Sequence, residues 1–316
     1  MRRQLVAYKF WPKLSLSGQD RKVIAQTIKL DHAFRGIYPS LQGFFASKTS
    51  SACGIRLDKE LVSFAWRMPR KWRIKNLNYH GISIGLVTTI KKFRGQGYAA
   101  RLMSEIEKDA KKHGVDFLYL QGIEQFYAKM GYVGFASKSK ITFERKKFKG
   151  ASPVVRKLQV RDTKEIKKLF QEYAQSEKGN VCRSGAVWRD LIGPLAQTFL
   201  FYNPHVICDG KKTIIGYFCS SPEDEKVIRE FACKPSLEAV EKCLLAICHQ
   251  KQIKKQEHFE IFAPFHGVVA DFARVRTGGD FVSFMRPRSS NMIKILNPKI
   301  KLENIQKTFV FQGDNI

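Results

Sequence analysis

Short apolar runs alternate with amphipathic stretches along the chain, and this pattern predicts a mixed α/β protein. The clearest helix covers 103–113, because Leu102, Ile106 and Ala110 recur on one face and Gly114 follows the last turn. Strands are predicted where apolar residues cluster between turn signals. In the first half they are 52–55, 61–66, 82–90, 117–120 and 133–143, and the first two form a hairpin.

The second half repeats this order of elements more faintly. Its predicted elements are a strand at 154–160, a helix at 163–173, a hairpin at 206–218, a strand at 227–232 and a helix at 237–250. A chain of 316 residues is long enough for two domains with cores of their own. We therefore predict a first domain at 1–150, a second at 151–288 and a C-terminal tail at 289–316.

The most informative segment is a glycine-containing loop between the predicted strand 82–90 and the helix that follows it. It reads Arg94-Gly95-Gln96-Gly97-Tyr98-Ala99. Two glycines let the backbone come close to an anion, and the free N–H groups of a helix start point to the same place. Strand-to-helix turns also use glycine for steric reasons alone, so the loop by itself leaves both interpretations open.

Two common phosphate-binding loops do not fit this segment. A dinucleotide fold requires three spaced glycines with an acidic residue about 20 positions later, and a triphosphate loop requires Gly-Lys-Ser or Gly-Lys-Thr. As Arg-x-x-Gly-x-Ala, the segment instead resembles the acyl-CoA diphosphate loop of the GNAT superfamily of N-acetyltransferases. Downstream, Phe126-Tyr127-Ala128-Lys129-Met130-Gly131-Tyr132 resembles the Phe-Tyr-x-x-x-Gly-Phe segment of the same family.

The resemblance implies tandem GNAT folds, each a mostly antiparallel mixed sheet with a central parallel, splayed strand pair and flanking helices. It also implies acetyl-CoA as the co-substrate, and Tyr127 as the general acid that protonates the departing sulfur. A phenol suits that role because it keeps its proton at neutral pH. A backbone N–H near Val87 is expected to polarise the thioester carbonyl. The implied cofactor-binding residues are Val87, Thr88, Thr89, Arg94, Gly95, Gln96, Gly97, Tyr98 and Ala99.

The implied reaction is direct transfer of an acetyl group to a primary amine of a small molecule or to a protein lysine or N-terminus. The base is not identified: His80, Glu124, the carboxylate of Ile316 and a water chain all stay open. The candidate substrate pocket contains Phe34, Trp66, His80 and Glu124, although aromatic residues at such positions are often core. Tyr38 and Trp72 are further aromatic candidates. The acceptor, the acyl-chain length and the oligomeric state are not specified by the sequence.

The second half lacks the glycine loop. Between its strand 227–232 and its helix 237–250 the chain reads Cys233-Lys234-Pro235-Ser236, so we expect no cofactor there. An active first copy followed by a degenerate second one is similar to the Eis-like (enhanced intracellular survival) acetyltransferases. Those relatives continue into a sterol-carrier-like domain, which we expect to be absent here or reduced to the tail 289–316.

Charge adds a second possible function. The net charge is +28, and residues 1–150 hold 30 Lys and Arg against 10 Asp and Glu, whereas 151–316 hold 26 against 18. A basic first half would attract an anionic acyl-CoA, and also nucleic acid. The basic residues are scattered, however, so a nucleic-acid role is possible but not favoured. The alternative to an enzyme is a non-catalytic module that senses acyl-CoA or binds RNA.

Other classes are disfavoured. Seven cysteines form no Cys-x-x-Cys pair, which favours reduced thiols and no metal site. No run of about 18 apolar residues occurs, and Lys9 interrupts the apolar start of the chain before a signal-peptide core can form. We therefore expect a cytoplasmic protein without a membrane partner.

Overall fold

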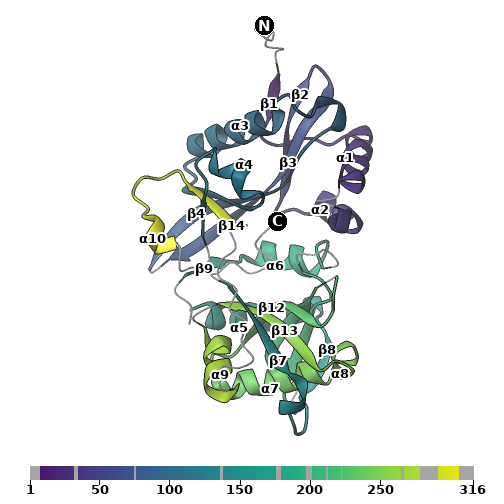
Figure 1. The fold of residues 1–316 in the computed structure, drawn as a ribbon, viewed down its shortest axis with the longest axis vertical. Helices are drawn as coiled ribbons and strands as arrows, with labels where there is room; N and C mark the ends of the chain where they lie inside the picture. Colours follow the sequence, from purple (N-terminus) through teal and green to yellow (C-terminus); the bar gives the residue numbers. More distant parts are fainter. Residues whose placement is uncertain are drawn as a thin grey trace.

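The computed structural model of the protein describes residues 8–31, 35–74, 76–135, 138–175, 179–196, 201–210, 213–221, 223–264, 267–277 and 291–305. These residues form two mixed β-sheets that follow one another along the long axis of the molecule (Figure 1). Each sheet contains one parallel strand pair and carries helices on its faces. The predicted α/β class with mixed sheets and flanking helices is confirmed.

The first sheet has the strand order β1-β2-β3-β4-β5-β14-β6, and β9 pairs with β3. Among the described strands of this sheet, only β4 and β5 run parallel. The predicted hairpin is present as β2 and β3. The strands are β1 (Lys9–Trp11), β2 (Ser51–Leu57), β3 (Glu60–Ile74), β4 (Leu77–Thr89), β5 (Phe117–Gln121), β6 (Val133–Gly134), β9 (Gly179–Cys182) and β14 (Asn291–Ile295).

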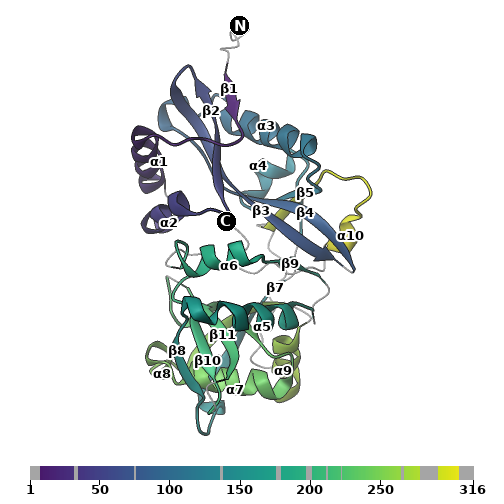
Figure 2. The ribbon, with the colours of Figure 1, turned by 180° about the vertical axis from the view of Figure 1, so that it is seen from behind.

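Four helices cover this sheet. α1 (Gly18–Leu30) and α2 (Leu41–Ala46) lie on one face, and α3 (Tyr98–Lys112) and α4 (Glu124–Ala128) lie on the other (Figures 1 and 2). A separate apolar cluster forms under each pair. α3 buries Leu102, Ile106 and Ala110, the face that the sequence pattern predicts.

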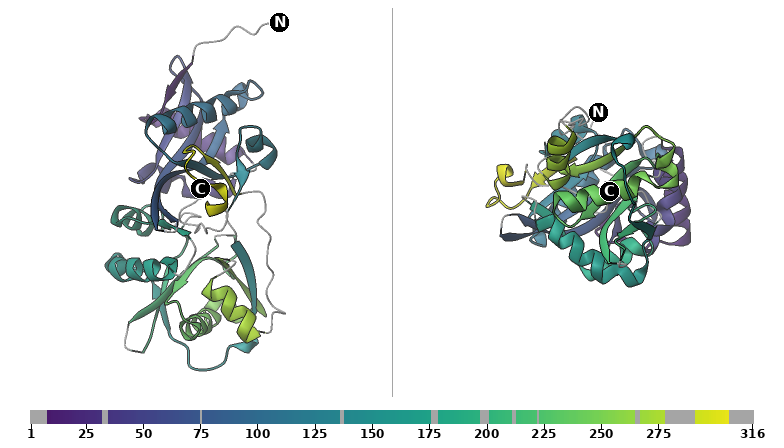
Figure 3. Two further views of the ribbon diagram at one scale, coloured as in Figure 1. Left: turned by 90° about the vertical axis from the view of Figure 1, so that its left-hand side faces the viewer. Right: turned by 90° about the horizontal axis from the view of Figure 1, so that it is seen from below.

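The second sheet has the order β7-β13-β12-β11-β10-β8, with β12 and β13 parallel. Its helices lie on opposite faces, α5 with α6 on one and α7 with α9 on the other (Figure 3). The strands are β7 (Lys138–Glu144), β8 (Val154–Lys157), β10 (His205–Cys208), β11 (Ile214–Ser220), β12 (Val227–Cys233) and β13 (His258–Pro264). The helices are α5 (Thr163–Gln175), α6 (Gly185–Ile192), α7 (Leu237–Cys248), α8 (Lys251–Lys254) and α9 (Val268–Thr277), and α10 (Leu302–Ile305) follows β14.

The two halves exchange strands. β7 comes before the second half in sequence, yet it pairs with β13 along its whole length, from Lys138 to Glu144. β14 follows the second half, yet it lies in the first sheet between β5 and β6. The prediction that 133–143 supplies the last strands of the first domain is therefore wrong for β7. The segment 289–316 is likewise more than a tail, because part of it forms a central strand.

A continuous contact joins the halves. β9 pairs with the end of β3, and Trp66 and Trp188 belong to one apolar cluster. Asp190 of α6 is buried and accepts hydrogen bonds from the hydroxyls of Ser47 and Thr49, both at 2.5 Å, and from the Thr49 N–H at 3.1 Å. A buried carboxylate is stable only when its oxygens are paired in this way. The two sheets therefore share one folded core.

Because β14 lies within the first sheet, we predict that it stabilises the first half. Ile293 is fully buried and packs in one cluster with Trp72 and Tyr119. Ile293→Ala should lower the free energy of unfolding by about 2–5 kcal/mol, the cost of a large-to-small change in a core. Urea denaturation measures this cost, and Ile295→Ala, at a half-buried position of the same strand, is the matched control. Equal small losses in both variants would contradict the placement of β14.

Candidate functional site

The parallel strands of the first sheet part before β4 ends. Gly81–Ile84 of β4 pairs with Phe117–Leu120 of β5, and β5 ends one residue later. The last five residues of β4, Gly85–Thr89, thus have no strand beside them on that edge in the described part of the chain. We call this stretch the open edge of β4.

A β-bulge shapes the open edge. Gly85 lies opposite Trp66 and Thr88 lies opposite Phe64, so Leu86 and Val87 together face one residue of β3. Leu86 has a φ of 53°, which is uncommon for a branched side chain and marks a locally strained backbone.

The bulge sets which backbone groups face the gap. The N–H of Ile90 donates to Val62 of β3 at 2.9 Å, so by alternation along the strand the groups of Thr88 also face β3. The groups of Val87 and Thr89 then face the gap. Val87 is half-buried, and this alternation turns its N–H and C=O away from β3. The backbone of Val87 is therefore available to a ligand.

The glycine loop follows β4 directly. After a short 3₁₀ turn at Lys91–Phe93, Gly95 and Gly97 adopt φ of 75° and 80°. A Cβ at either position would meet nothing within 4 Å, so the positive φ, and not close packing, is what requires glycine. Gly97 caps α3 without a side-chain bond, and within the described residues no acceptor is bonded to the N–H groups of 95–100. Free N–H groups at a helix N-terminus are suited to an anion.

The loop is tied to its surroundings by Arg94. Its Nε donates to the Thr89 carbonyl at 3.0 Å, and its guanidinium pairs with Asp31, just after α1, at 2.8 Å. Beside the loop is a cavity of about 380 Å³, which is lined by Thr89, Gly95, Gly97, Tyr98, Ala99 and Phe126 among others. The predicted residues of the loop therefore lie together. Gln96 is exposed and reaches back to the Lys92 carbonyl at 3.4 Å.

Tyr127 lies on α4, which begins shortly after β5 and faces the same gap. Its ring is largely buried against Phe126 and Tyr132, with ring centroids 4.9 and 5.7 Å apart. A Cβ at Gly122 would overlap the ring, so glycine at this turn makes room for it. Burial raises the pKa of Tyr127 to about 12. No described residue bonds its hydroxyl, which leaves the proton free to be donated.

Tyr132 is a neighbouring phenol of a different kind. Its hydroxyl is buried and has no hydrogen-bond partner among the described residues. Burial, with smaller contributions from Tyr127 and Glu107, raises its pKa well above the usual value. The family segment carries phenylalanine at this position, so the hydroxyl is an addition of this chain.

The structure separates the other predicted residues from this site. His80 is exposed, and its backbone is bonded to Asp116; it lies seven residues before Val87, about 23 Å along an extended strand. It is therefore too far from the open edge to act as the base. Trp66 is 1% exposed under Phe44 and Phe45 and is a core residue rather than a pocket wall. Glu124 is exposed at the start of α4.

Other residues named in the sequence analysis are placed as follows. Phe34 and Ile316 lie outside the described residues. Trp72 is fully buried, and Tyr38 is 38% exposed. No cluster of metal-binding side chains occurs in the described ranges, the seven cysteines are unpaired thiols, and none of the helices seen here is long and apolar enough to cross a membrane.

The corresponding turn of the second half is closed. Ser236 caps α7 by accepting a hydrogen bond from the Ala239 N–H at 3.2 Å. A side chain thus occupies the position at which the first half offers free N–H groups. The turn before α7 therefore differs from the glycine loop in having a side-chain cap.

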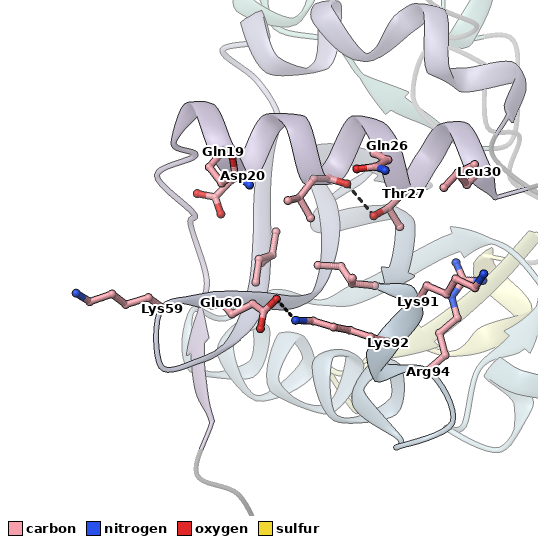
Figure 4. A pocket seen from close by; sticks show the side chains of 13 residues that line it. Gln19, Asp20, Gln26, Thr27, Leu30, Lys59, Glu60, Lys91, Lys92 and Arg94 are labelled. Carbon is pink, nitrogen blue, oxygen red and sulfur yellow. Dashed lines mark hydrogen bonds and ion pairs between the residues drawn. The ribbon is translucent and has the colours of Figure 1, made fainter.

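A second, larger depression lies on the opposite side of the loop. It runs between α1 and the residues Lys59–Leu61 and Ile90–Arg94, has a volume of about 730 Å³, and we call it the α1 groove (Figure 4). Neither this groove nor the role of Gly122 is predicted from the sequence. For Gly122 a signal existed, a glycine between a strand and a short helix, whereas the groove depends on packing between distant segments.

Comparison with known proteins agrees with the fold. A family model described as an acetyltransferase (GNAT) domain matches residues 43–134, a range that includes the open edge, the glycine loop and Tyr127. Among curated protein sequences, none matches the chain.

Solved structures resemble nearly the whole chain. A GCN5-related N-acetyltransferase from Anabaena variabilis is 15% identical with a TM-score of 0.69, over 92% of this chain and 73% of the other. One from Kribbella flavida is 13% identical with a TM-score of 0.62, over 92% and 71%. Eis1 from Mycobacterium abscessus is 14% identical with a TM-score of 0.60, over 92% and 74%. The protein thus carries a GNAT acetyltransferase domain at 43–134, within a two-sheet fold shared with GCN5-related and Eis-type N-acetyltransferases.

Proposed function

We propose that the protein is an acetyl-CoA-dependent N-acetyltransferase that transfers an acetyl group directly to a primary amine of a small molecule or a protein. The observation that carries this proposal is the junction of two features. The N–H groups at 95–100, which no described acceptor bonds, would hold an anion, and the backbone of Val87 faces the open edge of the strand that leads to them. A diphosphate and an amide-containing arm are the two recognition elements of coenzyme A.

The residues fit that co-substrate by shape and charge. The loop supplies N–H donors and the positive end of α3 to a diphosphate. The open edge supplies a donor and an acceptor at Val87 to an amide arm, which would pair as an added strand does. When bound, acetyl-CoA supplies an activated acetyl thioester.

In this proposal Tyr127 is the general acid. Its phenolic oxygen donates a proton to the sulfur as the C–S bond breaks and the amine nitrogen forms the new C–N bond. The phenolate that remains is reprotonated by solvent, and the amine gives up its proton to water. A backbone N–H near Val87, other than the one that pairs with the amide arm, stabilises the charge that develops on the carbonyl oxygen, as in an oxyanion hole.

A charge change in the loop tests the anion site. Gln96→Glu places a carboxylate among the N–H groups and should weaken acetyl-CoA affinity about tenfold or more, or about 1.4 kcal/mol. Isothermal titration calorimetry measures the acetyl-CoA affinity. Gln171→Glu, the same change at an exposed position of α5, is the control and should leave the affinity unchanged. Unchanged affinity in Gln96→Glu would refute the loop assignment.

Tyr127→Phe tests the general acid. Loss of a general acid should lower kcat about 100-fold or more with little change in acetyl-CoA affinity. Release of free thiol from acetyl-CoA in the presence of an amine measures kcat. Tyr132→Phe is the matched control, because it removes a buried phenol hydroxyl from the same cluster and restores the residue of the family segment. If both variants turned over at the wild-type rate, Tyr127 would only pack in the core.

The raised pKa of Tyr127 predicts the shape of the pH profile. The active form is the protonated phenol, and with a pKa of about 12 it stays protonated across the usable range. For a lysine acceptor, kcat/KM should rise about tenfold per pH unit below the amine pKa of about 10.4. No fall should follow up to pH ~10.5. A falling limb below that pH that disappears in Tyr127→Phe would show that the phenol ionises earlier than the structure implies.

A further inference from the structure

The α1 groove is long, and its walls differ in character. α1 contributes one helical face, Gln19, Asp20, Val23, Gln26, Thr27 and Leu30. At 1.5 Å per residue, the distance from Gln19 to Leu30 is about 17 Å. Five residues of extended chain span about the same length. The groove is thus shaped for an extended polymer rather than for a compact amine.

The charges of the groove are unbalanced. Both of its acids are already paired, Asp20 with Arg56 at 2.8 Å and Glu60 with Lys92 at 2.5 Å. Lys59 and Lys91 are exposed, and neither has an ion-pair partner in the described part of the chain. Lys59 lies toward one end of the groove and Lys91, close to Arg94, toward the other (Figure 4). An occupant with negative charges near both ends would complement them.

The remaining lining favours a peptide over a nucleic-acid strand. Val23, Leu61 and Ile90 add apolar side chains to the lining of the groove. The amides of Gln19 and Gln26 border it (Figure 4). Such amides can pair with a peptide backbone. Among the described residues no aromatic side chain lines the groove, although single-stranded nucleic acid is usually held by stacking on aromatic rings. The carboxylates of Asp20 and Glu60 would also lie close to phosphates.

The groove adjoins the candidate active site. Arg94 lines both the groove and the cavity beside the glycine loop. Ile90 of the groove lining is three residues from Val87, about 10 Å along the strand. A chain held in the groove can therefore present an amine to the open edge.

We propose that the α1 groove docks an acidic, extended peptide segment of a polypeptide acceptor, with Lys59 and Lys91 pairing to its carboxylates. The acetylation of such a segment rests on the proposed function, whereas its docking does not. Lys59 and Lys91 set the preference for acidic flanks and take no part in the chemistry.

Fluorescence anisotropy tests the docking on the full chain. The probe is a labelled peptide with one lysine between pairs of glutamates; a second probe has glutamines in their place. The variant is Lys59→Gln/Lys91→Gln. The matched control is Lys13→Gln/Lys22→Gln, two exposed lysines outside the groove with no recorded ion pair. The groove variant should bind the acidic peptide at least tenfold more weakly, the control should bind within twofold of wild type, and the glutamine peptide should bind weakly to all three.

Several results would overturn the proposal. If both lysine variants bound the acidic peptide equally weakly, the binding would be a general effect of net charge. If the wild-type protein bound the acidic and the glutamine peptides equally well, the carboxylates would have no role. Full displacement of the peptide by an oligouridylate at a lower concentration than by unlabelled peptide would assign the groove to RNA. If the groove variant lost affinity for acetyl-CoA but not for 3′-dephospho-CoA, the lysines would belong to the nucleotide end of the co-substrate. Binding of the peptide without its acetylation would leave the docking intact and refute the proposed function instead.

Discussion

The site depends on one incomplete pairing, the loss of a neighbour by β4 at Gly85–Thr89. An unpaired strand edge inside a sheet is unfavourable unless something else takes its hydrogen bonds. β4 keeps its place because its other edge remains bonded to β3, where Ser63 also donates to the Thr88 carbonyl at 2.9 Å. On the β5 side the chain turns away at Gly122 into α4, and the ring of Tyr127 fills the space that a Cβ would need. One turn thus opens the edge and places the phenol beside it.

The exchanged strand extends this dependence to the C-terminal part of the chain. β5 has only its β4 pairing on one side, and that pairing covers four residues, whereas β14 pairs with it from Phe117 to Gln121. β5 is therefore held in place on one side by β4 and on the other by a strand that follows the second half. Lys294 of β14 also pairs with Glu107 of α3 at 2.5 Å, which joins the same strand to the helix that follows the loop. The C-terminal strand β14 consequently supports the site from a part of the chain that follows the second half.

Local features of the site could be predicted from the sequence, and non-local ones could not. The glycine loop, the helix start and Tyr127 lie within one short stretch of chain, so residue type and spacing specify them. The hydrophobic pattern identifies β7 as a strand, but a period of two does not say which sheet a strand joins, and the sequence predicts the segment of β14 only as part of a C-terminal tail. The same limit explains why His80 and Trp66 are wrongly expected in the substrate pocket. Each is near the site in sequence or in type, and only the tertiary packing places one far along the strand and the other inside the core.

The second half carries a buried polar network on its sheet. Arg183 and Glu230 are fully buried and joined at 2.7 Å, and Tyr217 donates to Glu230 at 2.9 Å. The guanidinium of Arg183 also lies over the rings of Phe170 and Trp188, at 4.4 and 4.9 Å. Removing either partner of such a buried ion pair would be strongly destabilising, because the other charge would stay buried without a counter-ion. Glu230 lies on β12, past the point at which β12 and β13 separate. A buried, paired network thus occupies the place on β12 that corresponds to the open edge of β4, so the two halves use the same parting of parallel strands in different ways.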